Sequence, residues 1–327
     1  MRRITYGPPG TGKTERLLKT IEIFLRFGVE PEKIGYFTFS KNAAINGKER
    51  AASKVNKPIN RFPFFQTLHS FCFKQMGLDQ SRVMQPKHYH ELGNDLDIEI
   101  EGGYKQDQDH DGTLRYDNPY LQLIHKARAL MLEPLEYYDK HEQDDTEIKR
   151  NKLDIIFEGL NIYKEEKGMV DFDDMLERYV NGYFDKETNR KIEFVPPEFK
   201  VVFLDEAQDC SGMQWKLFNK IEERSEYQVV TGDDDQGIYK WNGADVDTFI
   251  NLKGKRRVLK QSHRVPKEPF KVANRIIKKV TNRVDKEYYP KEEDGSVKDC
   301  QSLHEINFTK GKWLVLATAN YMLNDIG

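Results

Sequence analysis

The sequence predicts an α/β fold built around a parallel sheet. Short apolar runs, several of them apolar at successive positions, alternate with segments of helical periodicity, as expected for parallel strands that helices cover on both faces. In addition, the string GPPGTGKT at residues 7–14 follows the first apolar run and opens the first helical segment. This spacing of glycines before Lys-Thr is typical of a phosphate-binding loop, which requires a strand before it and a helix after it.

The first predicted strand, at residues 2–6, precedes a helix with apolar residues on one side: Leu17, Leu18, Ile21, Phe24 and Leu25. Further strands are predicted at 34–39, 201–206, 227–233 and 256–260. Between residues 81 and 168 the strands give way to charged, helix-forming sequence, and the strand pattern returns after residue 169. We therefore expect a helical insertion at 81–168 within one α/β domain, whose two parts span 1–80 and 169–277.

The composition excludes several classes of protein. A chain of 327 residues with 38% hydrophobic, 32% charged and 12% aromatic residues is expected to form an ordinary globular core, not a disordered or collagen-like chain. No run approaches the 18 apolar residues of a membrane span, so we expect no membrane association. The cysteines Cys72, Cys210 and Cys300 are too few for a four-cysteine metal site and are odd in number, so we interpret them as reduced thiols of a cytoplasmic protein.

Charge is unevenly distributed, although the net charge is only -2. Residues 253–283 contain twelve Lys and Arg and the single acid Glu268, whereas residues 91–117 contain nine acids and two bases. The first region is suited to phosphate groups and the second is not.

The phosphate loop predicts ATP and Mg²⁺ as ligands. Glycines allow backbone N–H groups to surround phosphates, Lys13 would reach the β- and γ-phosphates, and the Thr14 hydroxyl would bind Mg²⁺. The candidate nucleotide-binding residues here are Gly7, Pro8, Pro9, Gly10, Thr11, Gly12, Lys13, Thr14 and Glu15.

A second chemical motif, VVFLDEAQD at residues 201–209, is an apolar strand that ends in two acids. Sheets of this class place their active sites at such strand ends. Asp205 is therefore expected to hold Mg²⁺, directly or through water, and Glu206 to orient and deprotonate an attacking water.

The string DEAQD resembles motif II of the UvrD/Rep/PcrA-like superfamily 1 DNA helicases. Five other segments resemble family motifs in the same order: 38–44 (motif Ia), 67–71 (motif Ib), 169–176 (the return into the first domain), 232–244 (motif III) and 261–265 (motif IV). The resemblance implies a RecA-like P-loop NTPase sheet with a helical insertion, and the start of a second RecA-like domain at 278–327.

The segment GDDDQGIYKWNGA at 232–244 is the most diagnostic string. Its Gln236 can place an uncharged amide near a γ-phosphate, and Tyr239 and Trp241 offer rings on which bases can stack. By resemblance, Gln236 links the nucleotide to these DNA-contacting rings. The family usually has Arg where this chain has Asn242, so one phosphate or base contact is absent from the pattern.

The resemblance also assigns roles in the other motifs. Phe39 and His69 match positions that contact single-stranded DNA or couple it to the ATP site, and Lys41 begins a basic stretch at 41–61 that is suited to a phosphate backbone. Arg264 matches an arginine that contacts the γ-phosphate, with Lys13, Glu206 and Gln236 as the other catalytic candidates. His263 stands where the family usually has an aromatic residue that stacks on adenine.

Two family features have no counterpart in this sequence. The upstream segment whose glutamine contacts adenine is absent, and WLVLATANYML at 313–323 resembles the opening strand and helix of the second RecA-like domain, after which motifs V and VI do not follow. We expect a C-terminal helicase half, in the same or a separate polypeptide, as a partner. The stretch 253–283 and an apolar strand at 313–317 should then be partly uncovered.

The resemblance implies the ATP-binding portion of a 3′ to 5′ DNA helicase or translocase, with single-stranded DNA as partner and roles in DNA repair or replication. The motor of a RecB-like helicase-nuclease, a non-catalytic DNA- and ATP-binding remnant, and a P-loop kinase of a small substrate are alternatives. A kinase would have no use for the stacking rings of residues 239 and 241.

Two further patterns suggest metal sites only weakly. Asp107, Asp109, Asp111 and Gly112 have the spacing of a calcium loop, but its twelfth position is Asn118 instead of glutamate, and we expect an exposed acidic loop. His88, His90 and Glu91 lack a convincing third ligand.

Overall fold

A six-stranded, wholly parallel sheet forms the centre of the protein in a computed structural model that describes residues 1–100, 104–106, 114–116, 118–142, 148–186, 188–302 and 305–316. The strands follow the order β10-β1-β9-β8-β2-β3. Their bounds are β1 Arg2–Tyr6, β2 Ile34–Thr38, β3 Phe65–Gln66, β8 Phe199–Asp205, β9 Ser225–Gly232 and β10 Lys255–Val258. The predicted α/β fold is confirmed, and all five predicted strands lie in this sheet.

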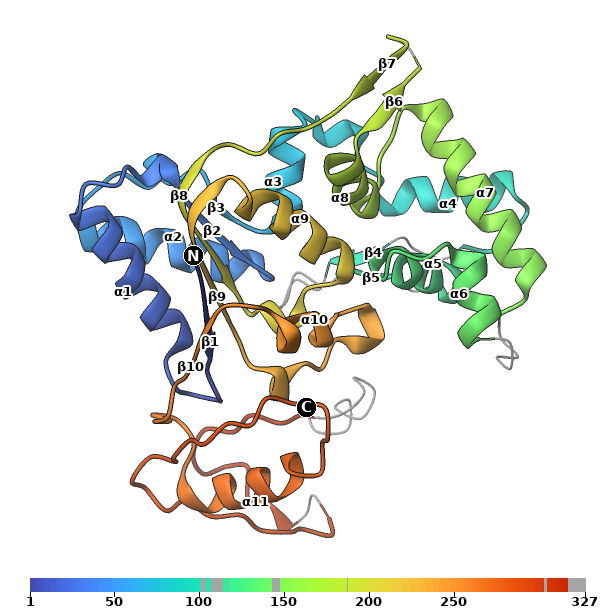
Figure 1. Ribbon diagram of the computed structural model, residues 1–327. Coiled ribbons are helices and arrows are strands. Elements are labelled where there is room, and N and C mark those ends of the chain that lie inside the picture. Colours follow the sequence, from blue (N-terminus) through green and yellow to red (C-terminus); the bar gives the residue numbers. More distant parts are fainter. Residues whose placement is uncertain are drawn as a thin grey trace.

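Helices cover both faces of the sheet (Figure 1). One face carries α1 (Lys13–Arg26) and α2 (Lys41–Val55), and the other carries α3 (Leu68–Gln75), α8 (Phe172–Asn181), α9 (Gly212–Glu222) and α10 (Val246–Asn251). The strands are therefore buried on both sides: Val201 and Phe203 of β8 face the first layer, while Val202 and Leu204 face the second. Because side chains alternate along a strand, a strand between two helical layers must be apolar throughout.

A separate hydrophobic cluster is made only of residues between Met84 and Met169. Its helices are α4 (Pro86–Asp95), α5 (Pro119–Ala129), α6 (Pro134–His141) and α7 (Arg150–Lys167). Three of them begin with proline, whose fixed φ and missing N–H suit the first helical position. In Figure 1 this green and cyan lobe lies beside the sheet.

The expectation that strands are absent from 81–168 is wrong. Two short strands, β4 (Tyr104–Gln106) and β5 (Leu114–Tyr116), pair in antiparallel orientation. A second antiparallel pair, β6 (Tyr183–Asp185) and β7 (Arg190–Ile192), follows α8. Strands of three residues are too short for an alternating pattern to be recognised. The suggested calcium residues 107–112 lie outside the described residues.

The C-terminal part is less buried than the rest. Helix α11 (Lys267–Ile277) has no buried residue, and it lies below the sheet in Figure 1 with the C-terminal segment. The strand predicted at 313–317 does not form in its described part, because residues 312–316 have no regular structure and no neighbouring strand to pair with among the described residues. Leu314 and Leu316 are each 82% exposed.

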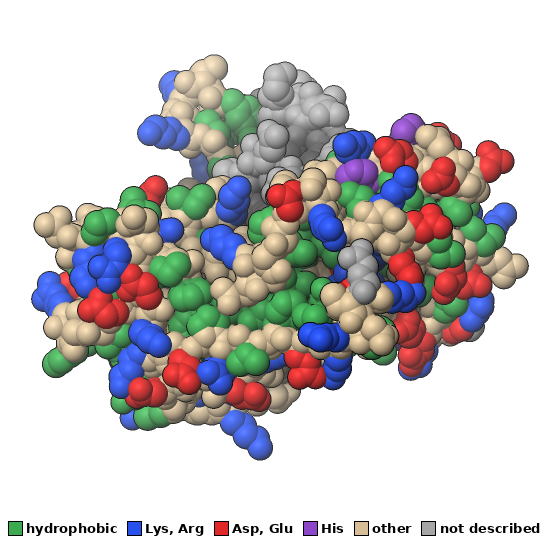
Figure 2. Space-filling view, turned by 90° about the horizontal axis from the view of Figure 1, so that it is seen from above, with side chains coloured by type: hydrophobic (Ala, Val, Ile, Leu, Met, Phe, Trp, Pro, Cys, Tyr) green, Lys and Arg blue, Asp and Glu red, His purple; other side chains and the backbone are tan. Residues whose placement is uncertain are grey.

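Two observations concern the surface. Lys, Arg, Asp and Glu are interspersed over the face seen from above, with hydrophobic side chains gathered near its middle (Figure 2). Across the described ranges, no helix has the length and apolar character needed to cross a membrane.

Candidate nucleotide-binding site

The phosphate loop joins the end of β1 to the start of α1. The N–H of Gly7 donates to the Gly232 carbonyl at the end of β9 (2.9 Å), and the Thr11 hydroxyl donates to the Pro8 carbonyl (2.7 Å). Gly10 and Gly12 have φ values of 73° and 80°, which favour glycine. The backbone conformation explains why glycines stand at these two positions.

Lys13 extends over this loop from the first turn of α1. Its ammonium donates to the Gly7 carbonyl (3.1 Å) and lies 3.5 Å from the Glu206 carboxylate. A Cβ at Gly7 would lie 2.0 Å from Cγ of Lys13, so only glycine leaves room for the lysine stem. The lysine is therefore held at the mouth of the loop, where phosphates would need a positive charge.

Asp205, at the end of β8, is buried and surrounded by hydroxyl donors. Its Oδ2 accepts from Thr14 (3.0 Å) and Tyr36 (3.1 Å), and its Oδ1 accepts from Thr231 (2.7 Å). Burial, and then the neighbouring Asp205 carboxylate, raises the pKa of Tyr36 well above its ordinary value, so Tyr36 remains a donor. These bonds fix the orientation of the carboxylate. The sequence analysis did not identify Tyr36 or Thr231 as partners of Asp205.

The donor set suits Mg²⁺. A hydroxyl oxygen and a carboxylate oxygen lie next to each other beside a loop of glycines, and oxygen ligands of this kind are those that Mg²⁺ prefers. Thr14 and Asp205 therefore fit the metal that the motif implies.

Glu206 follows Asp205 in a left-handed backbone conformation, with φ of 52°. For a residue other than glycine this conformation costs on the order of 1–3 kcal/mol, and such outliers often occur at functional sites. Its carboxylate accepts from the Gln208 amide (3.1 Å) and faces Lys13. The turn thus directs the second acid of the motif toward the phosphate loop.

The segment 261–265 packs directly against the phosphate loop, although about 250 residues separate them in the chain. The Ser262 hydroxyl donates to the Pro9 carbonyl (2.7 Å), and the N–H of His263 donates to the Gly10 carbonyl (2.9 Å). A Cβ at Gly10 would lie 2.4 Å from Cβ of Arg264. These contacts place His263 and Arg264 beside the loop. Both residues are exposed, next to the space that a nucleotide would fill.

Gln236 lies in the turn after β9, where three aspartates are buried or half-buried. Its amide donates to Asp233. Two basic residues from the segment after α11 also face these aspartates: Arg283 pairs with Asp235 (2.7 Å) and Lys286 with Asp233 (2.8 Å). The sequence reasoning missed both, because isolated basic residues in a basic stretch carry no distinguishing signal.

Three rings predicted to contact DNA form a continuous row. The Phe39 and Tyr239 ring centroids lie 5.4 Å apart, and those of Tyr239 and Trp241 lie 6.3 Å apart. Trp241 is 50% exposed, while Phe39 and Tyr239 are half-buried. Lys41 is exposed at the start of α2, two residues beyond Phe39. The row offers ring faces on which bases can stack.

His69 lies behind this row and is half-buried. It lines a cavity of about 40 Å³ with Phe39 and Tyr239, and its Nε2 is buried without a hydrogen-bond partner. Burial lowers the pKa of His69 to about 4. His69 is therefore neutral near pH 7.

Several predicted phosphate-binding residues are instead in ion pairs. Arg50 and Lys54 of α2 pair with Glu15, so Glu15 is directed toward α2. Lys57 and Arg61 likewise pair with acids, in this case with Glu30. In the stretch 253–283, by contrast, Lys255 and Arg257 line a cavity of about 250 Å³ together with other basic residues. The sequence showed the charges but not their partners.

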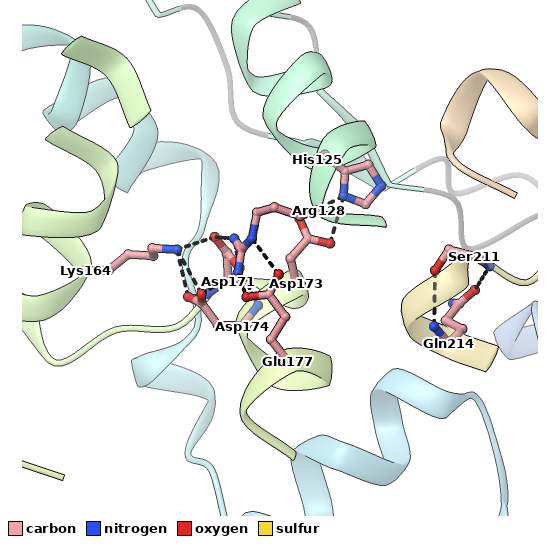
Figure 3. A network of polar contacts seen from close by, with 9 residues as sticks. All are labelled: His125, Arg128, Lys164, Asp171, Asp173, Asp174, Glu177, Ser211 and Gln214. Atoms are coloured by element: carbon pink, nitrogen blue, oxygen red, sulfur yellow. Dashed lines mark hydrogen bonds and ion pairs between the residues drawn. The ribbon is translucent and has the colours of Figure 1, made fainter. Parts of the chain in front are cut away.

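A buried ionic network connects α5 and α7 to α8 (Figure 3). Arg128 of α5 pairs with Asp171 (3.0 Å), Asp174 (2.7 Å) and Glu177 (2.8 Å). Lys164 of α7 also pairs with Asp171 (2.7 Å). Arg128 of α5 and Lys164 of α7 thus converge on the first turns of a helix that packs against the sheet.

His125 extends this network toward the cavity. Its ring lies 2.9 Å from Asp173, and both residues line the cavity behind the aromatic row. Burial by itself lowers the pKa of His125, but Asp173 raises it, and the net change is an increase. At the same place α9 begins with a capping box, in which Ser211 and Gln214 exchange hydrogen bonds.

The weakly indicated site at His88 and Glu91 has a structural explanation. His88 accepts from the N–H of Gln85 (2.8 Å) at the start of α4, and Glu91 accepts from the Tyr163 hydroxyl (2.6 Å). Within the described ranges, no group of three or more His, Cys, Asp or Glu is placed to hold a metal.

The parallel sheet, with a phosphate loop after β1 and an acid pair after β8, defines a RecA-like P-loop domain. The sequence profile of the UvrD/REP helicase N-terminal domain matches residues 3–256, and the chain belongs to this family. The predicted resemblance is therefore confirmed.

Named relatives agree with this assignment. The chain is 25% identical to a probable DNA helicase II homolog of Mycoplasma capricolum, over 97% of this chain and 45% of the relative. It is 26% identical to the ATP-dependent DNA helicase PcrA of Bacillus subtilis, over 88% of this chain and 39% of the relative. The chain thus spans less than half the length of these relatives.

Proposed function

We propose that the chain is the ATP-binding portion of an ATP-dependent DNA helicase or translocase that moves 3′ to 5′ on single-stranded DNA. The observation that carries this proposal is the convergence of Lys13, Asp205 and Glu206 at the phosphate loop, with Arg264 on its other side. Membership of the helicase family supports the proposal, and a cytoplasmic location accords with it.

In this proposal the chain binds ATP and Mg²⁺. The loop 7–14 surrounds the phosphates, Lys13 offsets their charge, and Thr14 and Asp205 hold the metal. When bound, Mg²⁺ neutralises charge that develops on the phosphate oxygens. Glu206 orients a water and accepts its proton, because it is the half-exposed carboxylate beside Lys13. Gln236 and Arg264 contact the γ-phosphate, and His263 faces the base.

Single-stranded DNA would follow the aromatic row. Phe39, Tyr239 and Trp241 are spaced for stacking, and Tyr239 is only three residues from Gln236. The turn after β9 therefore contains both the proposed phosphate contact and the proposed DNA contacts. This arrangement supports coupling of hydrolysis to movement along the strand.

We further propose four regions: 1–80 and 169–277 as two parts of the first RecA-like domain, 81–168 as the inserted subdomain, and 278–327 as the start of a second domain. The separate cluster between Met84 and Met169 supports the insertion. A C-terminal half with motifs V and VI would complete the enzyme. The absence of buried residues in α11 and the exposed Leu314 and Leu316 support such a partner.

The test is ATP hydrolysis with and without an oligothymidine. We expect slow turnover by the 327-residue chain alone, and a large increase with DNA when a C-terminal half from a relative is fused or added, since an arginine delivered to a transferring phosphoryl group is worth about 10³ to 10⁵ in rate in GTPases. A chain that neither binds nor hydrolyses ATP in either form would contradict the proposal. Vigorous DNA-stimulated turnover by the chain alone would show that no further half is needed.

A further inference from the structure

Three consecutive aspartates follow β9 and are largely removed from water. The side chains of Asp233 and Asp234 are fully buried, and that of Asp235 is 10% exposed. Adjacent carboxylates at this depth repel one another and lose their hydration. The turn therefore needs a compensating positive charge.

Lys286 supplies this charge from a segment more than fifty residues further along the chain. Its ammonium lies 2.8 Å from Asp233 Oδ1, 2.5 Å from Asp234 Oδ1 and 2.9 Å from Asp235 Oδ2. A lysine ammonium has three hydrogens, so it can donate one to each carboxylate. Burial by itself lowers the pKa of Lys286, but Asp233 and Asp234 raise it above its ordinary value, so the lysine is charged.

The two oxygens of Asp233 have different partners. Oδ1 accepts from Lys286, and Oδ2 accepts from the amide of Gln236. A second link begins at the main chain, where the N–H of Asp233 donates to Gln208 (2.9 Å). The Gln208 amide in turn donates to Glu206 (3.1 Å). Asp233 thus connects the buried lysine to the acid beside Lys13 and to the amide proposed to contact the γ-phosphate.

We propose that Lys286 is a positioning residue for Gln236, holding the amide through Asp233 in the place where a γ-phosphate can accept its hydrogen bond. The amide has two hydrogens, and the bond to Asp233 orients the other. Without the lysine, the Asp233 carboxylate has no charged partner on Oδ1. The orientations of the Asp233 carboxylate and of the Gln236 amide bonded to it are then no longer fixed. This inference rests on the proposed ATP-binding function.

Other contacts fasten the same segment to the turn, so Lys286 is not needed merely to hold it in place. Arg283 donates twice to Asp235, at 2.7 Å each, and the N–H of Val284 donates to Asp234 (2.7 Å). Arg283 makes no contact with Asp233 or Gln236 among the described residues. Arg283→Met is therefore a matched control, which removes one half-buried cation of the cluster but leaves the link to Gln236.

The test compares the affinities of ADP-Mg and of a non-hydrolysable ATP analogue with Mg²⁺, each measured by displacement of a fluorescent ADP. The dissociation constant of ADP-Mg divided by that of the ATP analogue measures the preference for the triphosphate. This ratio reports the γ-phosphate contact without requiring turnover. A hydrogen bond to a charged group justifies an expected fall in this ratio of about tenfold for Lys286→Met. Arg283→Met should keep the wild-type ratio, and Lys286→Arg should keep more of it than Lys286→Met.

A double variant separates positioning from general stability. If Lys286 acts through Gln236, Lys286→Met should lower the ratio no further in a Gln236→Ala background. Additive losses, or a wild-type ratio in folded Lys286→Met, would overturn the inference. If circular dichroism shows that Lys286→Met does not fold, the same comparison is made in an Asp234→Asn background, where one buried carboxylate fewer loses its cation and the bond from Gln236 to Asp233 is kept. Equal ratios with and without Lys286 there would also overturn it.

Failure of the proposed function gives a different result. A wild-type chain that binds neither nucleotide contradicts the proposed ATPase, and with it the role of Gln236. A chain that binds both nucleotides, but whose preference for the triphosphate does not depend on Lys286, contradicts only the positioning role.

Discussion

Replacing Arg128 by methionine should destabilise the fold where α5 packs against α8. Its guanidinium pairs with Asp171, Asp174 and Glu177, and its side chain is 9% exposed. Removing one partner of a buried ion pair costs about 3–5 kcal/mol, because the other charge is left buried and unpaired. Lys164 still compensates Asp171 and Asp174, whereas Glu177 loses its cation, so we expect about 3 kcal/mol.

The assay is urea unfolding followed by circular dichroism, with the free energy of unfolding extrapolated to water. Arg150→Met is the matched control, since Arg150 and its partner Asp139 are 47% and 41% exposed, and an exposed pair is worth at most about 1 kcal/mol. A midpoint for Arg128→Met that equals that of Arg150→Met would refute the reasoning. The buried network would then contribute no more to the free energy of unfolding than an exposed ion pair does.

Three other predictions concern the site. Glu206→Gln should lower ATP turnover by about 10² to 10⁴ and leave ATP affinity intact, because the amide keeps the shape but cannot accept the proton; equal turnover would exclude Glu206 as the base. Trp241→Ala should weaken binding of an oligothymidine by about 1–3 kcal/mol, with little dependence on base sequence, and an unchanged dissociation constant in a fluorescence titration would exclude stacking. For His69, whose pKa in the folded state is about 4, stability should be lost as pH falls from about 6.5, the unfolded value, toward 4, by about 2 kcal/mol at pH 5. His69→Gln should lack this loss, so a constant difference between the two proteins from pH 7 to 5 would contradict the buried neutral ring.

The sequence predicted the phosphate loop and the acid pair because each is a local pattern with a fixed spacing. Residues 201–204 of β8 are apolar, and the strand ends at Asp205. The carboxyl ends of parallel strands form one edge of such a sheet, where active sites lie. Thr14 and Asp205 could therefore be expected to meet, and their side chains lie 3.0 Å apart.

Contacts between distant residues could not be predicted in the same way. Tyr36 occupies a strand position that an apolar residue would fill equally well, and only the sheet order places its hydroxyl against Asp205. Arg128 and Lys286 are single charges among 52 basic residues, and their burial depends on partners 43 and 53 positions away. No periodicity or spacing marks such residues before the fold is known.

The measurement that tests the central claim most directly is the affinity of the chain for ATP-Mg, by isothermal titration calorimetry, in wild type and Lys13→Ala. Lys13 is the ammonium held over the phosphate loop, and its removal leaves the phosphates without their main compensating charge. We predict one site in the wild type and no detectable binding in Lys13→Ala, with the circular dichroism spectrum unchanged. Equal affinity in the two proteins would contradict the assignment of residues 7–14 as the nucleotide site.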